Sequence, residues 1–218
     1  MNTQIKKNTT FAIVSLLVLT LLISCKKTEY QYHHDGSLEA EIVYRGKKLH
    51  GITKWYYPAG NVKQIIEYKN NKINGKVKKF YPTGEKMSLE NFVADKIDGT
   101  ATYWHKNGNV YEIINYDKGV KNGEYINYHQ NGFTKAEGSF YNDLFDGEWK
   151  YYEENGITVG KGVFDKGNGE LTSFDLRGKI TRKVSYKNNM KNGEEIWYDS
   201  NGNISRILIY EDDNLVAE

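Results

Sequence analysis

The side chains with the most chemistry to offer recur at one place in a repeated pattern. Three of the five histidines stand at that place, six residues after the start of a repeated unit, and carboxylates hold it in later units. Imidazole and carboxylate groups are the side chains that bind zinc or carry out acid–base chemistry. The residues at this position are His33, His105, His129, Glu153, Asp175 and Asp199.

The spacing between units argues against a metal site or a catalytic pair. Equivalent strands of neighbouring hairpins lie about 10 Å apart, at about 4.8 Å per strand. Zinc binds its ligands at about 2.0–2.1 Å, so His105 and His129 cannot share an ion. Carboxylates that flank a glycosidic bond stand about 5–9.5 Å apart, so the acidic row keeps a glycan hydrolase open as an alternative. Nothing around the row predicts a raised carboxyl pKa, and we expect no catalytic residue, no metal and no cofactor.

Composition excludes several classes of protein. The 218 residues include 30 Lys and Arg against 28 Asp and Glu, which leaves a net charge of +2 and no basic stripe for nucleic acid. The single Cys rules out a disulfide framework. With 18 Tyr, 21 Gly and 2 Pro, the chain suits short strands joined by tight turns.

The first segment is typical of a secretory signal peptide. Lys6 and Lys7 precede 14 apolar or small residues, Phe11 to Ser24, a run too short for a membrane helix of about 20 residues. It ends in Leu-Ile-Ser-Cys25, which resembles the lipobox of bacterial lipoproteins. The resemblance implies removal of residues 1–24 and lipidation of Cys25. Lys26 and Lys27 replace the Asp that retains lipoproteins in the inner membrane of enteric bacteria, so in a Gram-negative host we expect the outer membrane.

The rest of the chain repeats one unit. Seven glycines open units at spacings of 24, 24, 24, 24, 22 and 24, and a second glycine follows each after nine residues. An aromatic residue stands at position five and another at position seventeen of every unit, with an eighth unit beginning near Lys27. The opening glycines, at position zero, are Gly51, Gly75, Gly99, Gly123, Gly147, Gly169 and Gly193.

Each unit predicts a β-hairpin around an Asn-Gly turn such as Lys106-Asn107-Gly108. A two-residue turn would put the two aromatic positions on opposite faces. A three-residue loop with a left-handed glycine and a bulge pairs position six with ten. In that register we expect positions five, eleven, fifteen and seventeen to form one apolar face, and positions four, six, twelve and fourteen the other.

Segments such as Gly147-Glu-Trp-Lys-Tyr-Tyr-Glu-Glu-Asn-Gly156 resemble the bacterial variant of the MORN repeat over about residues 27–210. The resemblance implies an all-β fold, with hairpins forming one elongated, twisted antiparallel sheet. Proteins of this kind are often lipoproteins, and many are described as antitoxin-like. The period of 24 is longer than the usual one, and the mid-unit Gly-x-Gly pair of eukaryotic repeats is missing, so phosphoinositide binding is not implied.

A group of aromatic residues in the early units falls on the face predicted to be polar. A contiguous aromatic patch on such a face marks either a contact with a partner or packing within the chain, and both alternatives stay open. The candidate binding face consists of Trp55, Tyr57, Tyr81, Tyr103 and Tyr111.

These observations predict a non-catalytic, lipid-anchored scaffold of the bacterial envelope. It would be held to the membrane through Cys25 and would bind a protein or a glycan; an antitoxin-like neutralising partner is the alternative. The sequence leaves the oligomeric state open. We expect a signal peptide at 1–24, a lipidated Cys and tether at 25–29, about seven and a half repeats at 30–210, and a tail at 211–218.

Overall fold

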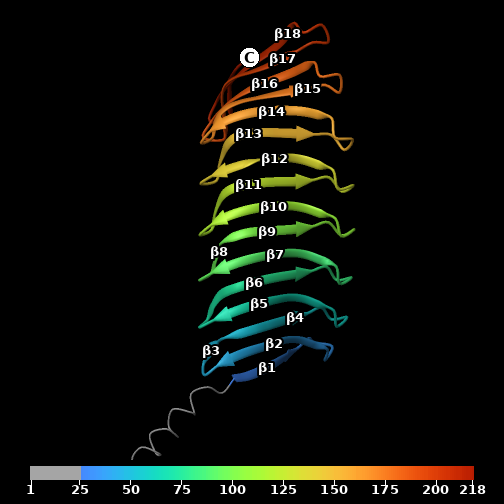
Figure 1. Cartoon of the computed structure of the whole chain (residues 1–218), viewed down its shortest axis with the longest axis vertical. Helices are drawn as coiled ribbons and strands as arrows, with labels where there is room; N and C mark the ends of the chain where they lie inside the picture. The colour runs from blue at the N-terminus through green and yellow to red at the C-terminus, as the bar shows by residue number, and fades with distance from the viewer. Residues whose placement is uncertain (1–25) are drawn as a thin grey trace, which may run out of the picture.

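The structure is a computed structural model that describes residues 26–218. These residues form one 19-stranded antiparallel sheet, stacked strand by strand along the long axis of the molecule (Figure 1). The predicted elongated all-β repeat sheet is confirmed. The strands are β1 (Lys26–Tyr32), β2 (Leu38–Arg45), β3 (Lys48–Leu49), β4 (Gly51–Tyr56), β5 (Val62–Lys69), β6 (Lys72–Phe80), β7 (Lys86–Val93), β8 (Lys96–Ile97), β9 (Gly99–Trp104), β10 (Val110–Asp117), β11 (Val120–Tyr128), β12 (Thr134–Tyr141), β13 (Leu144–Tyr152), β14 (Thr158–Asp165), β15 (Asn168–Phe174), β16 (Ile180–Lys187), β17 (Met190–Tyr198), β18 (Ile204–Glu211) and β19 (Asn214–Ala217).

Neighbours in the chain are neighbours in the sheet. Each long strand pairs with the strand before it and the strand after it, as β10 does with β9 and β11. β3 and β4 both pair with β2, and β8 and β9 both pair with β7, so each of these couples is one strand in two pieces. The predicted signal peptide and Cys25 lie outside the described residues.

The Asn-Gly turns have the three-residue form that the sequence predicts. In the unit that opens at Gly99, His105 N–H donates to the Asn109 carbonyl at 2.9 Å, and Gly108 N–H donates to the His105 carbonyl at 3.0 Å. Gly108 has a φ of 88°, a left-handed value that favours glycine. Trp104 pairs with Val110, so the predicted register at the turn is confirmed. These turns follow one edge of the sheet (Figure 1).

A second bulge makes the predicted face assignment wrong. Trp104 pairs with Val110, but the next pair is Tyr103 with Glu112, so Tyr111 at position twelve is an extra residue. One extra residue exchanges the two faces of the strand beyond it. Position five therefore lies opposite positions fifteen and seventeen, and position four shares their face.

The other edge of the sheet carries two-residue turns. In the turn between β5 and β6, Asn70 and Asn71 have φ values of 53° and 70°, the left-handed pair typical of tight hairpin turns. Beyond the turn, Asn74, Gly75 and Lys76 together face Glu67, because the register shifts by two residues there. Gly75 has a φ of 129° in this bulge, and a side chain at this point would overlap Glu67.

The one 22-residue spacing has a structural explanation. β14 and β15 pair without a register shift, from Gly160 opposite Ser173 to Asp165 opposite Asn168. The two residues missing from this unit are the two that form the bulge elsewhere. A 24-residue unit is therefore a 22-residue hairpin pair with a two-residue bulge at its opening glycine.

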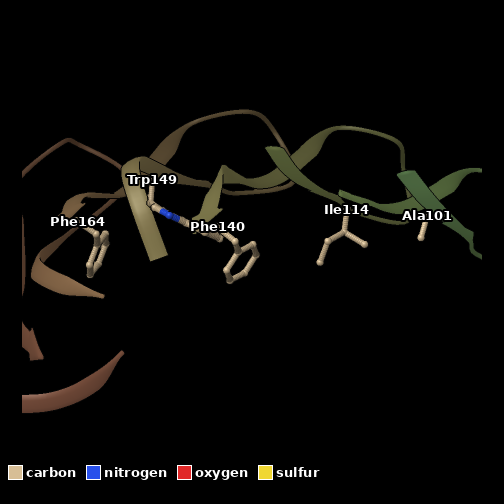
Figure 2. Close-up of a cluster of buried hydrophobic side chains, with 5 residues drawn as sticks. All are labelled: Ala101, Ile114, Phe140, Trp149 and Phe164. Atoms are coloured by element: carbon tan, nitrogen blue, oxygen red, sulfur yellow. The ribbon is translucent and has the colours of Figure 1, made fainter. Parts of the chain in front are cut away.

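All the buried residues lie on one face of the sheet, which we call the apolar face. It is formed by positions two, four, thirteen, fifteen and seventeen, with a further residue two before the opening glycine. Its central cluster is shown in Figure 2, where the five side chains hang from the same side of the ribbon: Ala101, Ile114, Phe140, Trp149 and Phe164.

Candidate binding surface

The histidine row predicted from the sequence forms a hydrogen-bonded ladder along the Asn-Gly turns. The Nε2 atom of His129 lies 2.8 Å from the Tyr152 carbonyl oxygen, and His33 and His105 make the same contact with Tyr56 and Tyr128 at 3.1 and 3.4 Å. A carbonyl oxygen only accepts, so each imidazole donates from Nε2. The histidines thus join each unit to the next. In residues 26–218 no cluster of three or more metal-ligating side chains occurs.

Two residues of the candidate binding face belong to the same ladder. The hydroxyl of Tyr57 donates to the Phe80 carbonyl at 2.9 Å, and that of Tyr81 donates to the Trp104 carbonyl at 2.8 Å. Both side chains are half-buried at the turns. Their hydroxyl groups are therefore engaged in joining units.

The carboxylates further along the row stay within their own turns. The Asp175 carboxylate accepts hydrogen bonds from the backbone N–H groups of Arg177 and Lys179, both at 2.9 Å. The hydrogen bond from the Lys179 N–H is the main cause of a lowered pKa of Asp175. The matching hydrogen bond from the Asn203 N–H lowers the pKa of Asp199. Glu153 is exposed.

The other three residues of the candidate binding face lie in two different places. Trp55 and Tyr103 occupy position four, so they lie on the apolar face, where Tyr103 packs against the central cluster. Tyr111 is the extra residue of the bulge; it is 42% exposed and meets the His105 ring edge-on, with ring centroids 5.1 Å apart. The expectation that the five share one face is wrong, because the bulge at position twelve moves position four across the sheet.

The apolar face differs between its two ends. In the C-terminal half Phe140, Trp149 and Phe164 are buried. Trp149 contacts Phe140 and Phe145 edge-on, and Phe145 contacts Phe164 at a tilt, with ring centroids 4.5–5.4 Å apart. In the N-terminal half the large aromatics are half-buried, and we call this group the aromatic strip. Its members are Tyr44, Trp55, Tyr68, Phe92, Tyr103 and Tyr116.

Sequence reasoning placed the position-seventeen aromatics on one apolar face with positions five, eleven and fifteen, and so missed the aromatic strip. Every element in residues 26–218 is a strand of the one sheet, so no second layer from these residues covers the strip. Burial nevertheless raises the pKa of Tyr68, Tyr103 and Tyr116.

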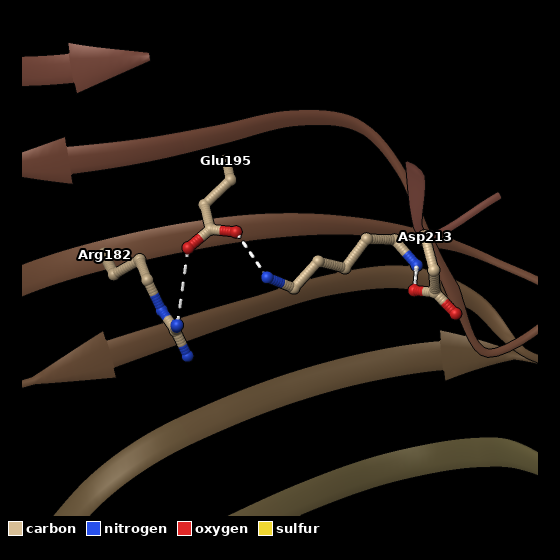
Figure 3. A network of polar contacts seen from close by, with 4 residues as sticks. Arg182, Glu195 and Asp213 are labelled. Carbon is tan, nitrogen blue, oxygen red and sulfur yellow. Dashed lines mark hydrogen bonds and ion pairs between the residues drawn. The ribbon is translucent and has the colours of Figure 1, made fainter. Parts of the chain in front are cut away.

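Buried charges interrupt the apolar face. The Glu90 carboxylate, 6% exposed, lies 3.3 Å from Lys79 Nζ near Tyr103. Glu195, 2% exposed, lies between Arg182 at 3.4 Å and Lys191 at 2.6 Å (Figure 3). The hydrogen bond from Lys191 to Glu195 raises the pKa of Lys191. Each of these buried carboxylates therefore has a cationic partner within ion-pair distance, which offsets part of the cost of desolvation.

The opposite face is polar and repeats one small network. Tyr56 donates to the Glu41 carboxylate at 2.9 Å with Lys54 at 3.3 Å, and Tyr152 donates to Glu137 at 2.6 Å with Lys150 at 3.9 Å. Beside Glu137 lies a hollow of about 340 Å³ that is open to solvent, with Glu124, Glu148 and Lys150 among its lining residues. This face therefore holds position-five aromatics against carboxylates.

The repeated hairpin with its glycine-led bulge and three-residue turn matches a known family. The chain belongs to the MORN repeat variant family. The matched segments cover more than half of the sequence, and the unmatched unit near 121–142 has the same hairpin, β11 and β12. The matched segments are residues 49–70, 73–94, 97–118, 145–166, 168–188 and 191–212.

Two solved structures contain regions similar to this MORN repeat variant chain. One is a Tc holotoxin pore from Photorhabdus luminescens carrying a TccC3 mutation, at 16% identity and a TM-score of 0.22 over 84% of this chain. The other is a TcdB2-TccC3-Cdc42 complex, at 13% identity and a TM-score of 0.22 over 80% of this chain. The match spans 12% of the length of either neighbour. Among curated proteins no relative matches the sequence.

The described part of the chain holds no helix of the length and apolar character that crossing a membrane requires. The MORN repeat variant chain is a repeat scaffold.

Proposed function

We propose that this MORN repeat variant protein is a lipid-anchored, non-catalytic scaffold of the bacterial envelope that binds a protein through the aromatic strip. The observation that carries the proposal is the strip itself: six half-buried aromatic residues on a face that no layer from residues 26–218 covers. Tyr and Trp dominate protein interfaces because they combine a large apolar body with a polar group.

The charges within the strip favour a protein over a glycan as the ligand. Glu90 lies beside Tyr103 and pairs with Lys79, and Gln64 and Glu112 occupy position thirteen of the units that open at Gly51 and Gly99, on the same face. An interface with an aromatic centre and interspersed charges is typical of protein partners, for which charge complementarity sets specificity. Glycan binding remains an outcome of the test.

The acidic row gives little support to a glycan hydrolase. A general acid at neutral pH needs a carboxyl pKa raised by burial or by a like charge. The pKa values of Asp175 and Asp199 are instead lowered by hydrogen bonds from turn N–H groups. These carboxylates act as caps of their own turns.

The lipid anchor would set the orientation of the scaffold. Cys25 directly precedes β1, so a lipid on Cys25 would hold the first strand at the membrane surface. The aromatic strip lies in the units closest to that end. A protein held at the same membrane would meet it over a short distance.

Photo-crosslinking on the full chain in native membranes tests this proposal. A photoreactive phenylalanine analogue replaces Tyr68 or Tyr44 on the strip, and the matched control places it at Ile52, which is 50% exposed on the polar face at the same height. We expect one protein adduct from both strip positions and none from Ile52, with loss of the adduct in Trp55→Ala plus Tyr103→Ala.

Equal adducts from all three positions would overturn protein binding. A strip that gives no protein adduct, on a purified chain that retains glycan, would overturn it as well. Turnover of glycan by the purified chain would overturn the non-catalytic assignment.

A further inference from the structure

Inside the sheet, the second strand of each unit pairs with the first strand of the next unit. The two ends of the sheet each carry one of these two strands. Between β16 and β17, Arg182 pairs with Trp197, Lys183 with Ile196 and Val184 with Glu195. At the tail of the sheet, Arg206, Ile207 and Leu208 are the counterparts of residues 182–184 one unit later. At the head, Glu29, Tyr30 and Gln31 are the counterparts of residues 195–197 in the first unit.

Both sets lack a partner on one side among the described residues. β1 pairs with β2 alone, and β19 pairs only with Ile209, Tyr210 and Glu211 of β18. The backbone of residues 206–208 therefore ends the sheet as an open edge, in the stretch that β19 is too short to reach. An open edge is a template for a further strand.

We propose that a second copy of this chain adds its β1 to the open part of β18, joining copies head to tail. In this arrangement Arg206 faces Gln31, Ile207 faces Tyr30 and Leu208 faces Glu29 of the second copy. The sheet then continues across the junction with the register of its interior.

The charges at the two ends fit this junction. Within the chain, Arg182 at position thirteen binds Glu195 at position two of the following unit, at 3.4 Å. Arg206 and Glu29 hold the same two positions across the junction. In the single chain both charges have substitute partners, since Arg206 binds Glu218 and Glu29 binds Lys27 at 2.7 Å.

The exposed apolar residues at the two ends also fit. Tyr30 and Tyr32 at the head are 57% and 62% exposed, and Ile204 and Ile207 at the tail are 56% and 38% exposed. Terminal units of repeat proteins ordinarily present a polar outer side. Inside the sheet, Lys86 at position eleven covers the ring of Trp104 at position five of the next unit, so Ile204 would cover Tyr32.

The junction requires one local adjustment. The incoming strand would overlap the end of the chain that it joins. The same three positions of the unit are held by residues 26–28 of the incoming copy and by residues 216–218 of the chain that carries β18. Val216 is 51% exposed, and Ala217 pairs with Ile209 at the end of β19, so the junction requires residues 216–218 to leave β18 as Glu29 replaces Glu218 on Arg206. A contact of one strand pair is at the low end of interface sizes, so confinement to one membrane would favour it.

Cysteine crosslinking of the full chain tests the proposal. Tyr30→Cys and Ile207→Cys would face each other across the junction at a strand-pair distance that suits a disulfide. Within one chain the same two positions lie in β1 and β18, at opposite ends of the sheet (Figure 1), so a bond between them joins two copies. On oxidation of membranes we expect the double variant to give a ladder of dimers, trimers and longer species.

Single variants separate this arrangement from others. A mixture of Tyr30→Cys chains and Ile207→Cys chains should stop at dimers, and either variant alone should match the unaltered chain, which retains Cys25. Dimers from Ile207→Cys alone would show tail-to-tail contact, and a double variant that stays monomeric would show no contact. Either result overturns the proposal.

Charge reversal gives a second readout. Arg206→Glu or Glu29→Arg in the double-cysteine chain should lower the crosslinked yield by about tenfold or more, because like charges would then meet. Combining both reversals should restore it, whereas Arg177→Glu, on a turn, should leave it unchanged. Equal yields in all four chains would overturn the pairing of Arg206 with Glu29.

Discussion

At the scale of single residues, one close contact on the apolar face depends on a glycine. The Trp149 indole lies against Gly138 on the neighbouring strand, and its Nε1 atom donates to the Ser139 carbonyl at 3.0 Å. A Cβ at position 138 would overlap the Trp149 ring. The backbone of Gly138 has no left-handed requirement, so the lack of a side chain is what the site needs.

Gly138→Ala is expected to cost about 1–3 kcal/mol of unfolding free energy, since the added methyl group overfills the contact. Denaturant melts and the Trp149 fluorescence maximum would report it. Trp149→Ala alone should cost about 3–5 kcal/mol, and Gly138→Ala should then add little. If Gly138→Ala lowered the unfolding free energy of the Trp149→Ala chain by the same amount, overlap with the Trp149 ring would not be the cause of the loss.

The buried tyrosines predict a loss of stability at high pH. Burial raises the pKa of Tyr151 to about 12, against about 10 in an unfolded chain. Above pH 10 the unfolded chain releases a proton that the folded chain keeps, so folding stability falls as pH rises from about 10 to about 12.

For Tyr151 the slope approaches about 1.4 kcal/mol per pH unit. Tyr151→Phe should therefore flatten the fall in melting temperature over this range, while Tyr141→Phe, on an exposed side chain, should not. Identical pH profiles for the two variants would contradict the assignment.

At the scale of elements, the sequence predicts the strands and the turns but not the bulges at position twelve and at the opening glycine. Gly108 and its neighbours identify the three-residue turn because the turn needs a left-handed residue at one fixed place. Tyr111 offers no such signal, since a bulge residue at position twelve keeps ordinary backbone angles and varies in type from unit to unit. One unmarked residue was enough to exchange the predicted faces of Trp55 and Tyr103.

The 22-residue unit suggests how to remove a bulge. Deleting Lys72 and Ile73 would join Asn71 to Asn74-Gly75, the pattern of Gly167 followed by Asn168-Gly169. We expect the sheet to persist without the bulge, at a cost of about 1–3 kcal/mol for the half-buried Ile73 side chain.

Amide hydrogen exchange of β6 and β7 would measure the result. Deleting Val77 and Lys78 instead removes a residue that is 2% exposed and shifts the strand, so it should abolish protection there. Equal loss of protection in both deletions would show that the bulge is indispensable.

At the scale of the whole molecule, the period of the sequence predicted the single elongated sheet because every unit carries the same signals. The binding surface could not be predicted in this way. Strip residues differ from core residues only in whether other parts of a protein cover them. A tyrosine such as Tyr68 or Tyr116 gives the same repeat pattern in a covered core and on an uncovered face. The separation of Tyr57 and Tyr81 from Trp55 likewise follows from contacts between units.

The lipid anchor is a prediction about the whole molecule, and Cys25 lies outside the described residues. Cys25→Ser should abolish incorporation of labelled palmitate and release the chain from the membrane, because two or three acyl chains make the stable anchor. Ser24→Ala is the matched control and should retain the label. Unchanged labelling of Cys25→Ser would contradict lipidation.

The hydrogen bonds between units also determine how the molecule responds to force. They run along the long axis, so tension between the predicted lipid at Cys25 and any partner at the far end would load strand pairs in series. Such a sheet opens by peeling, one pair after another, rather than by shearing all pairs together. Each 24-residue unit that opens adds about 80 Å of extended chain. A protein bound near the C-terminal end could therefore be held at a limited tension while the distance to the membrane changes.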